Sequence, residues 1–175
     1  MQALQEKIFS LPAEAWHQNQ QRQKDYDVHR QTESIVLIFT DGAGWPDITI
    51  SREPGWDLLA AEAIPLMEDI ISRHYVPGGT IIRAMAAKLL PGEVIRPHYD
   101  KHPSFGHGHR IHVPIITNPR VRFMIDGQPY KFEVGNAYEI NNQKTHSVMN
   151  KGQEGRINFI FDYVPANRVL SAEPA

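Results

Sequence analysis

The chain of 175 residues contains no cysteine. Disulfide bonds, thiolate zinc sites and cysteine nucleophiles are therefore excluded, and any metal ion must be bound through nitrogen and oxygen atoms. The formal net charge is only −2, and no run of lysine or arginine provides the field that a nucleic-acid backbone attracts. No apolar run approaches membrane-spanning length, and the first residues lack the charged-then-apolar order of a signal peptide. We expect a cytoplasmic protein without nucleic-acid or membrane partners.

The chain also lacks a Ser/Gly linker, a low-complexity tract and an internal repeat. Its hydrophobic content of 41% supplies one good core but hardly two. We therefore expect residues 1–175 to form a single domain. Residues 1–79 would provide a helical flank and a leading strand, and residues 80–165 a β-rich core that carries the functional site.

The first part of the chain alternates between helix-forming and β-branched segments. Residues 4–24 are rich in helix formers and are interrupted at Pro12. Residues 34–39 form a β-branched apolar run closed by Asp41-Gly42, which predicts a buried strand. Residues 56–74 carry apolar side chains at helical spacing. One face of this helix should cover a sheet.

From Thr80 onward, short strand patterns alternate with turn signals. Strands are predicted over residues 80–90, 94–100, 110–117, 121–125, 130–134, 137–140, 147–150 and 156–164. Eight short strands favour a barrel or a jelly roll, whose mouth commonly holds small ligands and metals. The fold class is thus mainly β, with flanking N-terminal helices.

The motif His98-Tyr99-Asp100 is the first candidate for a metal site. With nine histidines and nine aspartates in the chain, an H-x-D pair arises by chance about half the time. Residues i and i+2 of a strand share a face, however, so His98 and Asp100 can reach one metal ion. With His146 they would form the two-histidine, one-carboxylate facial set of non-haem Fe(II) oxygenases. The alternative is a polar strand pair and a loop histidine with local hydrogen bonds.

Arg156 follows His146 by ten residues and is a candidate anion-binding group. A dicarboxylate needs a cation at one end, and arginine offers a planar, permanently charged fork. The alternative for Arg156 is a strand-end surface charge. Arg110 and His112 share one strand face and could also line a ligand pocket, although an inward histidine beneath a carboxylate is a common structural arrangement.

The candidate residues, together with several neighbours, occur in an order that is typical of a known family. They are His98-x-Asp100, Arg110-x-His112-Val113-Pro114, Gly127, Gly135, His146-x-Val148-x-Asn150, Arg156 and Asp162. Over roughly residues 80–165 this pattern resembles the aspartyl/asparaginyl β-hydroxylase family of 2-oxoglutarate-dependent oxygenases. The resemblance implies a double-stranded β-helix, which is a cupin-like jelly roll. It also implies Fe(II), with 2-oxoglutarate and O₂ as co-substrates, and hydroxylation with release of succinate and CO₂.

The resemblance also implies roles for individual residues. His98, Asp100 and His146 resemble the iron ligands, and Arg156 resembles the arginine that holds the distal carboxylate of 2-oxoglutarate. Arg110 and His112 resemble the R-x-H pair that lines the same cofactor pocket. Animal members of the family carry glycine where this chain has Asp100, so the chain is more similar to bacterial relatives with a full triad.

The sequence points to a small substrate, namely an amino acid, free or within a peptide. The loop over residues 101–109 could close the mouth of the jelly roll, and Arg122 or Arg110 offers a cation for an α-carboxylate. The three histidines of this loop, His102, His107 and His109, are spaced too loosely to be included among the metal ligands.

Two other function classes remain open from the sequence. A cupin-like metalloenzyme of another reaction class would use a similar barrel and metal ligands, but it would not need Arg156. A non-catalytic barrel that binds a small molecule is the third class. It would be indicated if neither Fe(II) nor 2-oxoglutarate changed the melting temperature.

Overall fold

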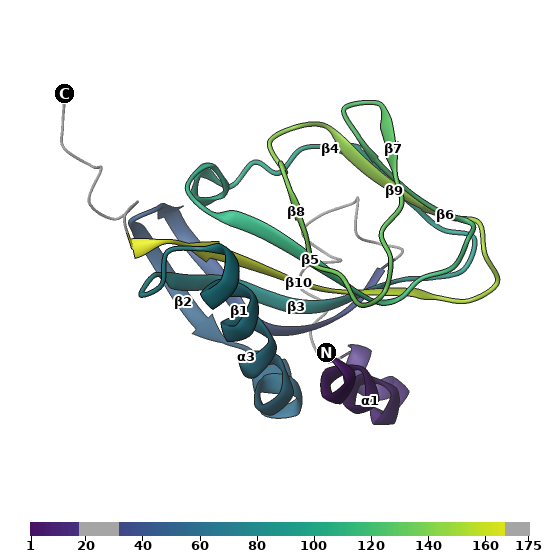
Figure 1. The fold of residues 1–175 in the computed structure, drawn as a ribbon, viewed down its shortest axis with the longest axis horizontal. Coiled ribbons are helices and arrows are strands. Elements are labelled where there is room, and N and C mark those ends of the chain that lie inside the picture. The colour runs from purple at the N-terminus through teal and green to yellow at the C-terminus, as the bar shows by residue number, and fades with distance from the viewer. Residues whose placement is uncertain (18–31, 167–175) are drawn as a thin grey trace.

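The computed structural model describes residues 1–17 and 32–166, which form two antiparallel sheets with helices packed beside the larger sheet (Figure 1). The helices are α1 (Gln2–Ser10), the 3-10 helices η1 (Ala13–His17) and η3 (Pro103–Gly106), and α3 (Gly55–His74). The strands are β1 (Thr32–Gly44), β2 (Asp47–Arg52), β3 (Thr80–Leu89), β4 (Val94–His98), β5 (His109–Ile116), β6 (Val121–Ile125), β7 (Gln128–Tyr130), β8 (Tyr138–Ile140), β9 (His146–Asn150) and β10 (Arg156–Val164).

The last eight strands alternate between the two sheets in the manner of a jelly roll, except that β6 and β7 form a hairpin within the smaller sheet. The larger sheet has the order β2-β1-β3-β10-β5-β8, and the smaller sheet has the order β4-β9-β6-β7. Each sheet thus receives four of the eight strands β3 to β10. The predicted mainly-β jelly roll is confirmed. Its larger sheet is extended beyond these eight strands by β1, which contains the leading strand predicted over residues 34–39, and by β2.

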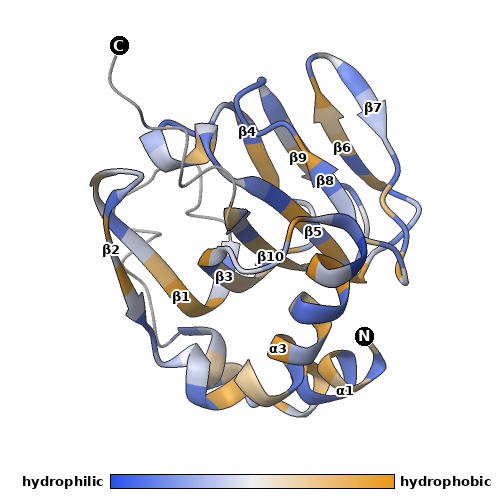
Figure 2. Cartoon of the chain, turned by 60° about the vertical axis from the view of Figure 1, so that its left-hand side comes forward, coloured by the Kyte–Doolittle hydropathy of each residue, from blue (hydrophilic) through white to orange (hydrophobic). Residues whose placement is uncertain are grey.

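The outer face of the larger sheet is apolar and packs against the helices. In β10, every second residue enters this core, and the set comprises Ile157, Phe159, Phe161 and Tyr163. Helix α3 contributes Leu59, Ala63, Met67, Ile70 and Ile71, as its helical spacing predicts. Figure 2 shows apolar segments of α3 and of the sheet strands. No helix in the two described ranges is both long and apolar enough to cross a bilayer.

The inner face of the larger sheet carries buried polar groups instead. Among the alternate residues of β10, Arg156, Asn158 and Asp162 are each at most 4% exposed. Buried His112 of β5 lies on the same face. A small apolar cluster closes the space toward the second sheet and contains Leu89, Phe123, Ile140 and Val148. The two-residue period of one strand therefore separates the structural core from a buried polar interior.

The first part of the chain contains more strand than predicted. Asp41-Gly42 does not end β1, which continues to Gly44 and pairs with β2, a strand that the sequence patterns did not indicate. Gly42 and Gly44 have φ angles of +105° and +132°, and the pairing register shifts between them. Glycine here permits an irregularity within a hairpin instead of stopping the strand. The predicted helix over residues 4–24 is confirmed as α1 and η1, and residues 18–24 lie outside the described ranges.

The predicted strand over residues 130–134 is displaced. Strand β7 occupies Gln128–Tyr130, because Asp126 and Gly127 form a two-residue turn with φ angles of 51° and 76°. Ile125 then pairs directly with Gln128, as in a tight hairpin. Residues 131–134 leave the sheet and become available to line a cavity.

Met67 of α3 is fully buried against the larger sheet. Replacing it by alanine should lower the free energy of unfolding by about 2–5 kcal/mol, because the cavity cannot fully collapse. Urea unfolding followed by circular dichroism measures this change. The adjacent exposed variant Glu68→Ala should stay within about 0.5 kcal/mol of the wild type. Equal effects of the two substitutions would contradict the assigned packing of α3.

Candidate metal centre and anion pocket

Two histidines and one aspartate converge at the end of β4 and the start of β9. His98 and His146 are directly opposite each other in the smaller sheet, and their ring centroids are 4.4 Å apart. Asp100 lies two residues after His98. One ligand atom from each of the three residues lies within 4.8 Å of the other two, the one such group found in the described ranges. The sequence spacing and the cross-strand register thus produce the same three-residue cluster.

The two imidazole rings are oriented by the backbone. His98 Nδ1 lies 2.7 Å from the carbonyl oxygen of Arg96, and His146 Nδ1 lies 3.0 Å from that of Lys144. A carbonyl oxygen only accepts hydrogen bonds, so both Nδ1 atoms carry the proton and donate it. The lone pair of each ring is then on Nε2, and such a contact to the other ring nitrogen is what fixes metal-binding histidines.

Asp100 is held by groups from two other parts of the chain. Its backbone N–H donates to the carbonyl of Asn142 at 3.0 Å, and the Asn142 side chain donates to Asp100 Oδ2 at 3.1 Å. Arg110 Nη1 also donates to Oδ2. The other oxygen, Oδ1, lies 3.9 Å from Nε2 of His98. The two carboxylate oxygens therefore have different surroundings, with Oδ1 facing the imidazole of His98.

The electrostatics of the cluster favour the protonation states of metal ligands. Burial alone would raise the pKa of Asp100, but Arg110, His146, Asn142 and His98 together lower it below its ordinary value. Burial lowers the pKa of His146 despite its backbone hydrogen bond. Near neutral pH the cluster therefore presents a carboxylate and an uncharged His146 imidazole. Two imidazole nitrogens and one carboxylate oxygen fit an Fe(II) ion and leave the opposite coordination positions for other ligands.

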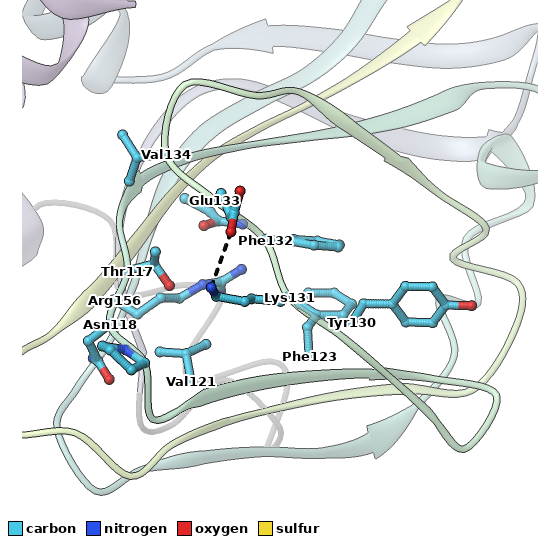
Figure 3. A pocket seen from close by; sticks show the side chains of 12 residues that line it. Thr117, Asn118, Val121, Phe123, Tyr130, Lys131, Phe132, Glu133, Val134 and Arg156 are labelled. Carbon is cyan, nitrogen blue, oxygen red and sulfur yellow. Dashed lines mark ion pairs between the residues drawn. The ribbon is translucent and has the colours of Figure 1, made fainter.

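A cavity of about 340 Å³ opens beside this cluster, and the Arg156 side chain reaches into it (Figure 3). Its lining includes Thr117, Asn118, Val121, Phe123, Phe132, Arg156 and Asn158. An exposed ion pair of 3.1 Å between Lys131 and Glu133 also lines it. The Phe123 ring lies between the two parts of the site. Its centroid is 5.8 Å from Cζ of Arg156 and 6.4 Å from the ring centroid of His146.

Arg156 is a buried cation, 4% exposed. Within the described part of the chain, no carboxylate forms an ion pair with it, and burial is what lowers its pKa to about 9. A charged group without a counter-ion in a desolvated place is costly. The arrangement therefore favours an anion from outside the chain at this position.

An aromatic wall lines one side of the cavity, and the sequence patterns do not indicate it. Phe132 stacks between Phe123 and Tyr138, with ring centroids 4.5 and 4.3 Å away. His112 meets Phe123 edge-on at 5.5 Å, and its Nδ1 lies 3.1 Å from the side-chain nitrogen of Asn158. His112 is therefore packed behind Phe123 and Asn158, two residues that line the cavity, and its predicted contact with a cofactor stays a prediction. Residues 131–134 matched a strand pattern, so their role as cavity lining carried no separate signal.

Two predicted cations have other surroundings. Arg110 is engaged by the carboxylates of Asp162 and Asp100, so the structure does not place it beside Arg156. Arg122 is exposed, and its guanidinium donates to the backbone carbonyls of Pro119 and Val121. Strand alternation puts Phe123 inward and Arg122 outward. The position of Arg122 thus does not support its expected role in substrate binding.

The loop over residues 101–109 is packed instead of loose. Its Phe105 ring is buried between two guanidinium groups, with Cζ of Arg83 at 4.7 Å and Cζ of Arg110 at 4.5 Å. At the end of the loop, His109 Nδ1 contacts Glu139 at 2.7 Å. The loop histidines lie outside the His98, Asp100 and His146 cluster.

Comparison with known proteins agrees with this architecture. The family model for aspartyl/asparaginyl β-hydroxylase matches residues 3–165. No curated protein sequence matches the chain at a significant level. A 2OG-Fe(II) oxygenase family oxidoreductase from Burkholderia pseudomallei is similar in structure, with a TM-score of 0.57 and 12% identity over 80% of this chain and 73% of that chain.

A cupin 2 conserved barrel domain protein from Salinispora arenicola is a more distant structural match, with a TM-score of 0.36 and 19% identity. That match covers 50% of this chain, which spans just under two thirds, 66%, of the cupin. The family match begins at residue 3 and so extends the resemblance expected for residues 80–165 into the first part of the chain. The chain therefore belongs to the aspartyl/asparaginyl β-hydroxylase family.

Proposed function

We propose that this enzyme uses Fe(II) and 2-oxoglutarate to hydroxylate an sp3 carbon of an amino acid, free or within a peptide. His98, Asp100 and His146 hold the iron, and Arg156 holds the distal carboxylate of 2-oxoglutarate. The observation that carries the proposal is the buried Arg156 cation, which lacks a carboxylate partner in the described ranges and lies across Phe123 from the metal cluster. A dicarboxylate would supply an anionic group at both places.

The residues of the chain bind and orient, and the bound cofactors supply the oxidising chemistry with release of succinate and CO₂. His98 and His146 each direct Nε2 toward the metal position, because their Nδ1 protons are held by the backbone. Phe123 and Phe132 line the cavity with apolar surface and so exclude water from that side of it. Asn158, which lines the cavity, contacts the ring of His112 behind it.

Family membership favours this function over the two alternatives. A cupin-like enzyme of another class would not require a buried, unpaired arginine at Arg156. A barrel that only binds a small molecule would not require two imidazoles preset for a metal beside a low-pKa carboxylate. For the target, we keep the amino acid that the sequence favours. The Phe105 ring of the loop over residues 101–109 packs against the guanidinium of Arg110, which contacts Asp100.

Replacing His98, Asp100 or His146 by alanine should abolish high-affinity Fe(II) binding and turnover while retaining the fold, since each supplies one of three metal bonds. Anaerobic titration with Fe(II), succinate release and thermal unfolding measure these effects. Asp100→Gly should weaken iron binding with an incomplete loss of rate. The exposed variant His74→Ala should behave as the wild type. Full activity in any of the three alanine variants would reject that residue as a ligand.

Arg156→Met should weaken 2-oxoglutarate binding by roughly thirty- to several-thousand-fold, since truncating a buried charged pair costs about 2–5 kcal/mol. Iron affinity should be unchanged. The variant without cofactor should melt at the same or a higher temperature than the wild type, because an unpaired buried charge has been removed. Binding of 2-oxoglutarate to the metal-loaded protein measures the first effect. The control is the exposed Arg120→Met, and a loss of affinity below threefold would contradict the role of Arg156.

Free amino acids should be substrates. In the presence of the enzyme, Fe(II), 2-oxoglutarate and O₂, at least one amino acid should gain one oxygen atom. Proline, aspartate and asparagine are tested first, with product mass and succinate as the readouts. Omission of 2-oxoglutarate is the control. Turnover restricted to a folded protein, with none on amino acids or short peptides at millimolar concentration, would reject a small substrate and leave the metal and cofactor roles intact.

A further inference from the structure

Arg110 connects the larger sheet to the metal cluster. Its side chain is 12% exposed, and all three of its guanidinium nitrogens donate to carboxylates of the chain. Nε and Nη2 donate to the two oxygens of Asp162, each at 2.7 Å, whereas Nη1 donates to Oδ2 of Asp100. Such a two-point arginine–carboxylate contact has strong directionality as well as energy.

The Arg110–Asp162 pair is built by the sheet itself. The two residues are direct cross-strand partners in β5 and β10, and both side chains emerge on the inner face. The Asp162 side chain is 3% exposed and gives both of its oxygens to Arg110. The guanidinium is therefore fixed in one plane relative to the larger sheet, and only its Nη1 edge is directed toward Asp100.

The contact with Arg110 gives the two oxygens of Asp100 different surroundings. Oδ2 accepts from Arg110 and from Asn142, while Oδ1 faces the imidazole of His98. If Asp162 were absent, the arginine fork would match both oxygens of Asp100 and compete with a metal for Oδ1. With Asp162 present, two of the three nitrogens are already engaged and that competition does not arise.

We propose that Arg110, clamped by Asp162, is a positioning residue that reserves Oδ2 of Asp100 and so presents Oδ1 as a single-oxygen metal ligand. The inference rests on the proposed metal role of Asp100 and replaces the expected contact of Arg110 with 2-oxoglutarate or a substrate carboxylate. Burial lowers the pKa of Arg110, but Asp162 and Asp100 raise it above its ordinary value, so the clamp stays charged. Partners behind a metal ligand typically change metal affinity by about 10–100-fold when mutated.

Asp162→Asn tests the clamp, with Co(II) as an air-stable probe and Fe(II) under anaerobic conditions. We expect metal affinity to fall by at least about tenfold, and the visible absorption of bound Co(II) to change, because it reports the ligand arrangement. Affinity of the metal-saturated variant for 2-oxoglutarate should stay within about threefold of the wild type. Asp69→Asn breaks a comparable arginine–aspartate contact on the exposed surface of α3 and should change none of these values.

Two further variants separate positioning from folding. Arg110→Lys keeps the charge but not the planar fork, so it should also weaken metal binding. The double variant Arg110→Gln/Asp162→Asn replaces the ion pair by two amides of similar shape, and its thermal unfolding reports whether the fold is retained. A folded double variant with metal affinity at least tenfold below the wild type supports positioning. Wild-type metal affinity and an unchanged Co(II) spectrum in that variant would overturn it.

The competing role has a different signature. If Arg110 binds 2-oxoglutarate or substrate directly, Arg110→Lys should raise the concentration required for that compound while leaving metal affinity unchanged, and this result would overturn the positioning role. Failure of the proposed function is also distinguishable. In that case the wild-type protein itself would bind neither Fe(II) nor Co(II), whatever the variants do.

Discussion

Everything in this molecule depends on the requirement that the larger sheet bury both of its faces. One face packs against α1 and α3 through aliphatic and aromatic side chains, and the other faces the smaller sheet. Strand β10 lies at the centre of this constraint, with Phe159 and Phe161 on the helical side and Arg156 and Asp162 on the inner side. The apolar side supplies the free energy that holds charged groups in a place where water is largely excluded.

In that interior, the charged side chains differ in whether a partner from the chain compensates them. Asp162 is compensated by Arg110 at two points, and Asp100 shares the remaining nitrogen of the same guanidinium. Arg156 has no such partner within the described ranges. A low dielectric makes both situations energetically important. A paired charge such as Arg110 fixes geometry, whereas the unpaired cation of Arg156 creates affinity for an external anion. Both arginines lie on adjacent strands of the larger sheet, Arg110 on β5 and Arg156 on β10.

The sequence predicted the grouping of His98, Asp100 and His146 better than it predicted the elements between them. The expected strand over residues 94–100 ends at His98, so Asp100 joins the group from just beyond β4, whereas the helix that covers the sheet follows from its apolar spacing. The sequence misplaces β7 and does not indicate β2, because a glycine turn signal does not reveal the backbone angles at Gly42 and Gly127. Phe132 was assigned to a strand, since an aromatic in a β-rich segment has the same local pattern whether it pairs or lines a cavity.

By itself, the sequence determined the jelly-roll class, the absence of thiolate chemistry, the candidate ligands His98, Asp100 and His146, and the candidate anion group Arg156. Only the tertiary structure decided how the remaining charges are used. Arg110 and Arg122 are equivalent cations in the sequence, yet one is engaged by two buried carboxylates and the other is exposed beside backbone carbonyls. The reason is that a counter-ion 52 residues away becomes a neighbour only through strand register, which local sequence patterns do not encode.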